Sequence, residues 1–188
     1  MSRSIHTIAI AGVALAILGA IISRPSQPLA QSAVPQPPRN FGWQEQPNSL
    51  GTFQLKERLA TLTLKPKTEL FDGRSLLSQT HGVDQRTITL LPWGDHGTYA
   101  TITTPKGTIH ATCLLADGTT VITRDEYLTH QNRRAALPET LWGYFLGQTD
   151  LRQWQCLWIE LTSLGNFSTQ EFESLISTLS QRLIPMKK

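Results

Sequence analysis

The middle of the chain decides the fold, because residues 99–122 read Tyr99-Ala-Thr-Ile-Thr-Thr-Pro-Lys-Gly-Thr-Ile-His-Ala-Thr-Cys-Leu-Leu-Ala-Asp-Gly-Thr-Thr-Val-Ile122. Thr, Ile and Val recur in this stretch with a period of two, which is typical of β-strands. Pro105-Lys-Gly107 and Asp117-Gly118 interrupt the pattern with residues that favour turns. The stretch therefore predicts a meander of three strands. Because successive strand residues face opposite sides, we expect His110 and Cys113 on opposite faces of the central strand.

Helices are expected downstream of this meander. Thr123-Arg-Asp-Glu126 and Ser168-Thr-Gln-Glu171 are capping boxes, in which a hydroxyl and a glutamate three residues later satisfy free N–H groups at a helix start. The first box predicts a helix to about Arg134, and the second predicts a helix that ends at Pro185. A shorter helix is expected over residues 138–146, because a proline begins this segment and a glycine follows it.

Three more segments show strand patterns. Residues 156–161 read Cys-Leu-Trp-Ile-Glu-Leu and are a strand candidate, and weaker strand patterns cover residues 53–64 and 87–91. Together these elements predict an α+β fold, in which an antiparallel sheet has helices packed on one face. An N-terminal apolar helix and a Pro-rich tether are expected to precede this fold.

The chain before the predicted domain has two unlike parts. Residues 8–22 form a run of fifteen residues without a charge, with Arg3 before it and Arg24 after it. This length suits the apolar core of an export signal, at about 7 to 15 residues, and approaches the lower limit of about 17 for a spanning helix. Residues 23–39 are rich in Pro, Gln and Ser, and such a segment buries too little apolar surface to fold. We therefore expect three parts: a signal or anchor helix over 1–22, a Pro-rich linker over 23–40, and an exported α+β domain over 41–188.

The leader has two possible fates. It is either an uncleaved membrane anchor, or it is cut near Ala30 or Ala33, although both sites lack the small residue that cleavage prefers at position −3. In both cases the body of the protein lies on the periplasmic side of the cell membrane. We expect it to be tethered there in the first case and released in the second.

Composition excludes two broad classes. Hydrophobic residues make up 39% of the chain and charged residues 16%, so the chain as a whole is not a disordered polymer. Lys and Arg total 17 against 14 acidic residues, but Arg3 and Arg24 flank the leader, and without them the balance is 15 against 14. A nearly neutral domain argues against binding of nucleic acid.

The sequence carries no Gly-rich phosphate loop, no nucleophile elbow and no paired-carboxylate spacing. Four histidines lack the i, i+2 or i, i+4 spacing that places two imidazoles on one side of an element: His81, His96, His110 and His130. Trp93-Gly-Asp-His-Gly97 places an acid beside a base, but its glycines favour a turn. We therefore expect no enzyme activity, no metal and no cofactor.

The two cysteines, Cys113 and Cys156, leave three possibilities open. In an exported protein they can form a disulfide, which would close a loop of 43 residues. They can instead be two separately buried thiols, or one of them can be a reactive thiol with a base nearby. His110 is close to Cys113 in sequence, but its expected position on the opposite face disfavours such a pair.

Aromatic residues concentrate in one part of the chain, where Trp142, Trp154 and Trp158 accompany Tyr144 and Phe145. Core packing is the usual explanation for such residues. The alternative is a patch that meets a partner or a membrane interface, where aromatic side chains are enriched.

Several segments between residues 112 and 162 together resemble a known family. They read Thr112-Cys-Leu-Leu-Ala-Asp-Gly-Thr-Thr-Val121, Asn132-Arg133, Leu141-Trp-Gly-Tyr-Phe-Leu-Gly147, Asp150-Leu-Arg152 and Cys156-Leu-Trp-Ile-Glu-Leu-Thr162. This pattern is similar to that of the cyanoexosortase A system-associated proteins. In that family a cysteine precedes a turn, an Asn-Arg pair follows in a helix, and a tryptophan segment leads into Asp-Leu-Arg and Cys-Leu-Trp.

The resemblance implies a non-enzymatic, membrane-tethered accessory protein of an exosortase system. An exosortase is an integral-membrane cysteine transpeptidase that processes exported proteins with a C-terminal sorting signal, often in connection with exopolysaccharide. The implied partners are the exosortase or its sorted cargo. On this interpretation Cys113 and Cys156 staple the sheet, and a docking surface or its supporting core includes Asn132, Arg133, Asp150, Arg152 and Trp158.

Two other functions stay open at this point. The protein can be an exported module that binds a glycan or lipid chain through the aromatic cluster between Trp142 and Trp158. It can also be a thiol enzyme that uses Cys113 or Cys156, which is the weakest of the three hypotheses.

Overall fold

The computed structural model describes residues 36–37, 42–46, 51–55, 59–105, 107–148, 151, 155–165 and 167–183. The predicted N-terminal helix over residues 1–22 and most of the linker over 23–40 lie outside these residues, so both stay predictions. Within the described part of the chain, every helix is too short or too polar to span a bilayer.

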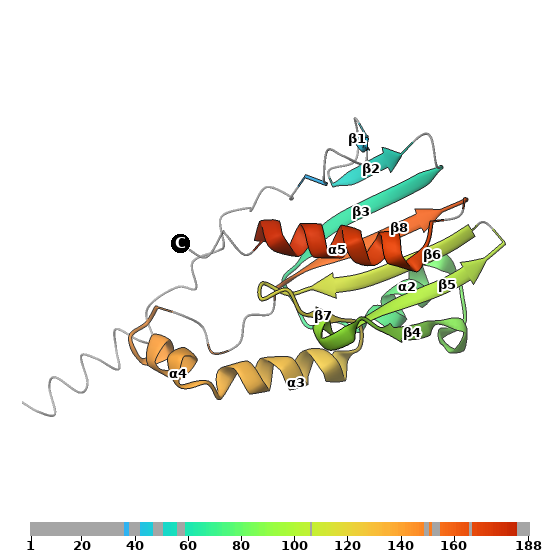
Figure 1. The fold of residues 1–188 in the computed structure, drawn as a ribbon. Coiled ribbons are helices and arrows are strands. Elements are labelled where there is room, and N and C mark those ends of the chain that lie inside the picture. Colours follow the sequence, from blue (N-terminus) through green and yellow to red (C-terminus); the bar gives the residue numbers. More distant parts are fainter. Residues whose placement is uncertain are drawn as a thin grey trace, which may run out of the picture.

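One antiparallel sheet organises the domain (Figure 1). Its strands follow the order β1-β2-β3-β8-β6-β5-β4, and β7 pairs with β6 outside this path. The strand bounds are β1 Gln44–Glu45, β2 Thr52–Leu55, β3 Ala60–Lys67, β4 Thr89–Pro92, β5 Thr98–Thr104, β6 Gly107–Leu114, β7 Thr120–Val121 and β8 Cys156–Ser163.

The strand predictions are confirmed, with one change. The meander over residues 99–122 forms β5, β6 and β7. The predicted strands over 156–161 and 87–91 correspond to β8 and β4. Residues 53–64 do not form one strand: the chain reverses within them, so that Leu55 of β2 lies opposite Ala60 of β3.

Four α-helices and two short 3₁₀ turns connect or follow the described strands. The bounds are α2 Gly73–His81, α3 Arg124–Ala135, α4 Pro138–Phe145, α5 Thr169–Leu183, η3 Gln85–Thr87 and η4 Gly94–His96. The three predicted helices are present as α3, α4 and α5, and the predicted turn at Trp93–Gly97 contains η4.

Both capping boxes form. The Thr123 hydroxyl accepts a hydrogen bond from the Glu126 N–H at 3.2 Å, and the Glu126 carboxylate accepts one from the Thr123 N–H at 2.9 Å. Ser168 and Glu171 make the same reciprocal pair at 3.2 Å and 2.9 Å. Each helix therefore begins where its local sequence places it.

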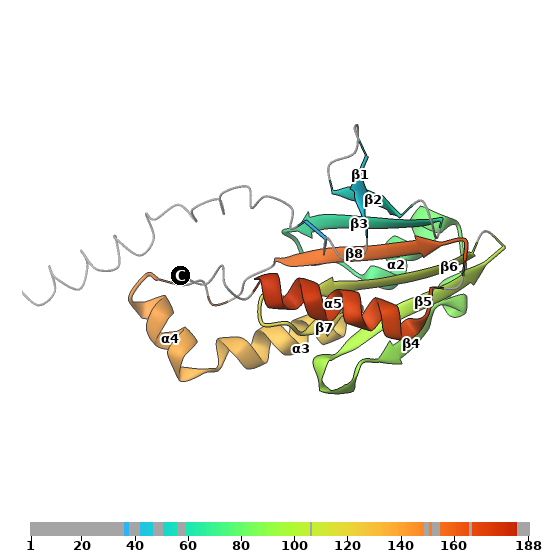
Figure 2. The same cartoon turned by 45° about the horizontal axis from the view of Figure 1, so that its top comes forward.

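Helices cover both faces of the sheet, and this corrects the prediction that they pack on one face (Figure 2). On one face, Ile159 and Leu161 of β8 pack in a core with Phe172 of α5. On the opposite face, Trp158 of β8 packs in a second core with Leu77 of α2, to which α3 also contributes. The physical reason is that β6 and β8 carry apolar residues on both faces, and each face needs cover.

The helix α2, on the second face, is the element that the sequence analysis does not predict. The sequence contains boundary signals for this helix, but the segment between them is short. The Asp72 carboxylate accepts a hydrogen bond from the Ser75 N–H at 2.9 Å, and Gly82 follows the helix with a φ of 64°. Aspartate at the N-cap and glycine after the C-cap are typical helix boundaries. Only nine residues lie between them, which is too few for a clear helical period.

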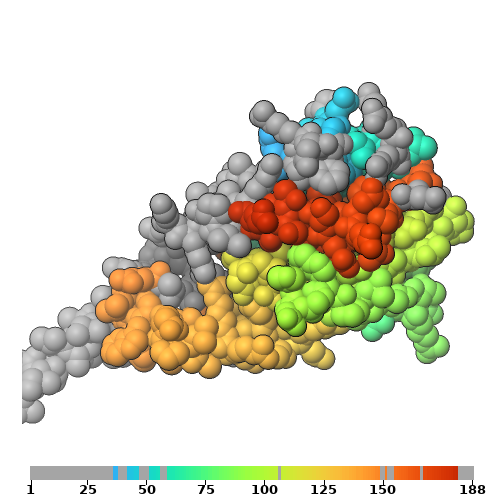
Figure 3. Space-filling model, viewed as in Figure 1, coloured from blue at the N-terminus to red at the C-terminus, as the bar shows by residue number. Residues whose placement is uncertain are grey.

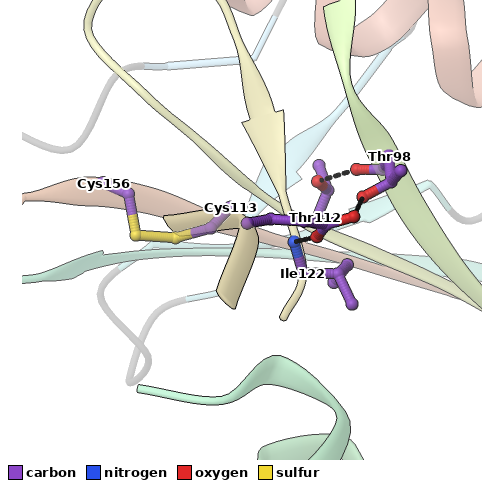
Figure 4. Close-up of a disulfide and its surroundings, with 6 residues drawn as sticks. Thr98, Thr112, Cys113, Ile122 and Cys156 are labelled. Carbon is purple, nitrogen blue, oxygen red and sulfur yellow. Dashed lines mark hydrogen bonds between the residues drawn. A yellow bond between two sulfur atoms is a disulfide. The ribbon is translucent and has the colours of Figure 1, made fainter. Parts of the chain in front are cut away.

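The disulfide possibility agrees with the structure. Cys113 of β6 and Cys156 of β8 are bonded, with Cα atoms 5.6 Å apart, and the bridge joins the two central strands (Figure 4). On the neighbouring strand position, the Thr112 hydroxyl donates to the Thr98 carbonyl of β5 at 2.9 Å. The chain has two cysteines, so neither is left as a free thiol in this state.

Candidate interaction surface

α3 and α4 form one end of the described domain (Figure 3). The helices are separated only by Ala136 and Leu137, and the Leu137 N–H donates to the Arg134 carbonyl at 3.1 Å. Pro138 then occupies the first turn of α4, where its missing N–H costs nothing. The chain therefore turns sharply at this corner and carries α4 away from the sheet (Figure 1).

The exposed side of α4 is apolar. Several large apolar side chains in and beside the helix face solvent: Trp142 is 68% exposed, Phe145 64%, Leu146 62%, Leu137 47%, Leu141 38% and Tyr144 38%. The buried residue of the helix is Gly143. An ordinary surface helix turns its large apolar residues inward and its small or polar residues outward, so α4 has the reverse arrangement. We call Leu141, Trp142, Phe145 and Leu146 the α4 face.

Backbone hydrogen bonds hold α4 in shape without help from the α4 face. At its start, the Leu141 N–H donates to the Leu137 carbonyl at 3.0 Å. At its end, the Gly147 N–H donates to the Tyr144 carbonyl at 2.9 Å, and Gly147 has a φ of 66°. A glycine in this left-handed conformation is a common helix end. The outward apolar residues are therefore displayed by a helix that begins at a proline and ends in a closed glycine turn.

Charged and polar side chains border the α4 face. Asn132 and Arg133 are exposed in the last turn of α3, and Arg134 beside them is half-buried. Glu139 is exposed in the first turn of α4. Cations at a helix C-terminus and an anion at an N-terminus stabilise the helix dipoles, which accounts for part of this pattern. The same arginines also give positive charge to the last turn of α3, directly before the turn into α4.

The predicted docking residues that the structure describes divide between the surface and the supporting core. Asn132 and Arg133 lie at the α3–α4 corner, whereas Trp158 is 2% exposed and belongs to the supporting core. The Trp158 ring meets Phe71 edge-on with a centroid distance of 5.6 Å. Two other predicted residues, Asp150 and Arg152, lie outside the described residues.

The predicted aromatic cluster divides in the same way. Trp142, Tyr144 and Phe145 are exposed, as a patch that meets a partner or a membrane would require. Trp158 is buried, as the usual explanation by core packing expects. Trp154 lies outside the described residues. Residue type did not distinguish the two environments, because aromatic side chains suit both.

A small polar hollow lies between α2 and the sheet, and the sequence analysis misses it because it misses α2. The hollow has a volume of about 110 Å³, room for roughly three water molecules. It is lined by Thr63, Lys65, Lys67, Leu76, Thr80, Trp158 and Glu160. The Glu160 carboxylate pairs with the His81 Nε2 at 3.0 Å and accepts from the Trp158 Nε1 at 3.2 Å. These contacts join α2 to β8. We therefore assign Glu160 and His81 a structural role.

The remaining histidines have local partners. His130 Nε2 lies 2.7 Å from the Asp117 carboxylate, and His96 packs against Trp93 with a centroid distance of 4.7 Å. Burial by itself would raise the pKa of Asp117, but hydrogen bonds from His130 and from the Thr119 N–H lower it well below its usual range. In the described part of the chain, His, Cys, Asp and Glu side chains form no group of three placed to hold a metal ion.

His110 and Cys113 do not form a catalytic pair. His110 is 2% exposed on the α5 side of the sheet, where its ring stacks on Phe172 at 5.1 Å and its Nδ1 lies 3.0 Å from the Thr101 hydroxyl. Burial lowers the pKa of His110, and a backbone group of Phe167 offsets this in part. Cys113 faces the α2 side and is bonded to Cys156. The predicted separation of the two residues on opposite faces is therefore confirmed.

Comparison with protein-family models, with curated proteins and with solved structures finds no significant match. The α3–α4 corner therefore has to be interpreted from its own chemistry. It combines a displayed apolar helix, exposed aromatic rings and neighbouring arginines, and these features suit binding.

Proposed function

We propose that the protein is a membrane-tethered, non-enzymatic accessory protein of an exosortase system. In this role its exported domain assists the exosortase or its sorted cargo at the periplasmic surface of the membrane. The observation that carries the proposal is the α4 face, where large apolar side chains point outward from a short helix. Exposed apolar patches of this kind are typical of interaction sites. The resemblance over residues 112–162 and the apolar run over residues 8–22 support the compartment and the partner class.

The chemistry at the α3–α4 corner suits contact. Trp142 and Phe145 offer rigid apolar area that loses little conformational freedom on binding. Arg133 is exposed in the last turn of α3, directly before the turn into α4, where its charge can set the orientation of a partner. Such groups bind and position a neighbouring molecule. We therefore place the role of the domain in recognition.

A second function is favoured by the aromatic rings themselves. Trp142, Tyr144 and Phe145 are the residue types that stack on sugars and enter lipid interfaces, so the domain can be a glycan- or lipid-binding module. The test is a titration of the purified protein with such ligands, followed by tryptophan fluorescence. Unchanged emission with every ligand class would contradict this function.

The accessory role is tested by deleting the gene and following the C-terminal processing of exported, sorting-signal-bearing proteins by intact-mass analysis. We expect unprocessed precursors in the deletion strain and their loss after re-expression of the wild-type chain. Re-expression of a Trp142→Gln, Phe145→Gln double variant at the same protein level should leave precursors behind, because its α4 face is polar.

The matched control is Leu59→Gln with Leu164→Gln. Both leucines are also strongly exposed, at 65% and 61%, and they are neighbours, since the Leu164 N–H donates to the Leu59 carbonyl at 3.1 Å. Leu59 directly precedes β3 and Leu164 directly follows β8, at the end of the sheet away from α4 (Figure 1). This control should restore processing. Normal processing in the deletion strain would overturn the accessory role.

A further inference from the structure

We propose that the α4 face rests in the interfacial layer of an anionic lipid bilayer, so that the domain lies on the membrane surface. The occupant of the face is then lipid, which holds the domain at the surface where the exosortase or its cargo lies. This inference rests on the membrane location in the proposed function, but it does not depend on an exosortase. It gives the domain a second attachment and a defined orientation.

The orientation of α4 is the first argument. Leu141 and Phe145 are one helical turn apart, as are Trp142 and Leu146, so the four side chains form one continuous apolar strip. Gly143, on the other side, is the buried residue of the helix. The strip therefore points away from the domain, and apolar cover has to come from outside it.

The residue types are the second argument. Tryptophan, tyrosine, phenylalanine and leucine are enriched on helices that lie in the plane of the membrane interface. Trp142 and Phe145 are each more than 60% exposed, and α4, which carries them, extends from one end of the described domain (Figure 3). A projecting strip suits a deformable lipid layer, into which large side chains can sink. A protein partner would need a matching groove.

The charge beside the strip is the third argument. Arg133 is exposed in the last turn of α3, directly before the turn into α4. Anionic headgroups attract cations close to the surface, and one arginine strengthens such attachment about fivefold. Glu139, exposed in the first turn of α4, is the one acidic residue in residues 132–148, which also contain Arg133 and Arg134, so this segment has a net charge of +1. Apolar strips beside positive charge are usual on peripheral membrane helices. Because of this charge, the proposal names an anionic bilayer.

Because the chain before the domain is expected to tether it to the membrane, α4 needs only a weak affinity for lipid to keep the domain on the surface. Residues 23–35 allow a reach of at most roughly 45 Å from the end of the apolar run, which exceeds the roughly 15 Å radius of gyration of a domain of this size. Any face of the domain can therefore meet the bilayer, and the face with affinity for lipid is selected. A tethered domain also has a high effective concentration at the membrane surface, so the weak lipid affinity of one short helix is enough to keep it bound there.

The experiment uses the full chain reconstituted in lipid vesicles. Both native cysteines are bonded to each other, so a Phe145→Cys variant carries a single free thiol, which is labelled with the fluorophore NBD. The matched control is Thr103→Cys, an exposed position on β5 at the end of the sheet away from α4 (Figure 1). Vesicles contain phosphatidylcholine alone or mixed with phosphatidylglycerol, and spin-labelled lipids serve as quenchers.

We expect blue-shifted NBD emission at position 145 and several-fold stronger quenching by spin-labelled lipid there than at position 103, in anionic vesicles. In the labelled Phe145→Cys background, Arg133→Gln should lower the ratio of docked to undocked domain about fivefold in anionic vesicles and hardly at all in neutral ones. Arg124→Gln removes the same charge from the exposed start of α3 and should have little effect.

Two results would overturn the inference. Equal quenching at positions 145 and 103 would show that α4 does not touch lipid. A blue shift at position 145 without quenching by lipid would show that protein, such as a second copy, covers the helix. Before labelling, one titratable thiol per chain verifies that the native bridge is intact, and circular dichroism verifies that the labelled variants are folded. Since processing of exported proteins is measured separately, failure here leaves the accessory role intact, and failure there leaves the lipid contact intact.

Discussion

His110 is a buried base with a structural role. It belongs to β6. Its side chain pairs with the Thr101 hydroxyl of β5, and its ring stacks on Phe172 of α5. Burial favours the neutral ring, because a charged imidazole would lose its hydration there. A histidine in this position makes the stability of the domain depend on pH.

The first prediction concerns this pH dependence. The pKa of His110 is lower in the folded state than the 6.5 of an exposed histidine, so the unfolded chain binds the proton more readily. The free energy of unfolding should therefore hold above pH 6.5 and fall as the pH drops below it. In a His110→Phe variant this fall should be smaller, as measured by urea unfolding at pH 7.5 and 5.5. The other histidines are the same in both proteins, and a parallel decline would contradict the assignment.

The second prediction concerns Cys113 and Cys156. Their bridge closes a loop of 43 residues, so replacing both by alanine should lower the free energy of unfolding by roughly 4 kcal/mol, as measured in urea. The wild-type protein isolated from cells should resist alkylation unless it is first reduced. Uptake of two alkyl groups by the unreduced, denatured protein would show that the bridge is absent in the cell.

At the scale of an element, α3 is tied to the sheet through its first turn. The Glu126 carboxylate accepts hydrogen bonds from the Ile122 and Thr123 N–H groups at 3.0 Å and 2.9 Å, and from the Thr98 hydroxyl of β5 at 2.9 Å. Burial opposes ionisation, but these hydrogen bonds lower the pKa of Glu126 overall. The capping residue thus joins the helix to a neighbouring strand.

The third prediction tests this cap. Thr123→Ala removes the acceptor for the Glu126 N–H and should lower the free energy of unfolding by about 1 kcal/mol. Thr129→Ala, at an exposed position of the same helix, should change it by less than about 0.5 kcal/mol. Both values come from denaturant unfolding curves. Equal effects of the two substitutions would argue against a role for the cap.

α4 and α5 differ in what their apolar residues contact. Phe172, Leu175 and Leu179 of α5 are buried against the sheet, as in an ordinary amphipathic helix. Trp142 and Phe145 of α4 face outward. The difference is one of tertiary position, because α5 crosses the sheet and α4 extends past its end (Figure 1). This contrast is why the binding role is assigned to α4.

At the scale of the whole molecule, one sheet separates the two cores, and its turns make contacts with neighbouring strands. The turn before β5 touches β7 at an isolated bridge between Gly97 and Thr120. The Thr120 hydroxyl also donates to the His96 carbonyl at 3.2 Å. This contact brings the start of β5 against the strand that precedes α3.

The fourth prediction tests this contact. Gly97 has a φ of 116°, and an added Cβ would collide with the Thr120 carbonyl. Gly97→Ala should therefore lower the free energy of unfolding by about 3 kcal/mol or more. Gly94 in the same turn has a φ of 49°, and no described atom lies within 4 Å of its added Cβ. Gly94→Ala should cost about 1 kcal/mol, and thermal or urea unfolding distinguishes the two.

The sequence alone determined the features that depend on neighbouring residues. The capping boxes at Thr123 and Ser168 and the period-two pattern of residues 99–122 specify where helices and strands lie, because their hydrogen bonds and alternation act within a few residues. The opposite placement of His110 and Cys113 follows from the same alternation.

Only the tertiary structure decided which surfaces are covered. Trp142 and Trp158 belong to one aromatic stretch of sequence, yet one is 68% exposed and the other 2%. Trp158 lies beneath α2, whose short signals between Asp72 and Gly82 left it unpredicted, and Trp142 lies beyond the end of the sheet. The physical reason is that burial depends on what packs against a side chain from distant parts of the chain, and a local pattern does not contain that information.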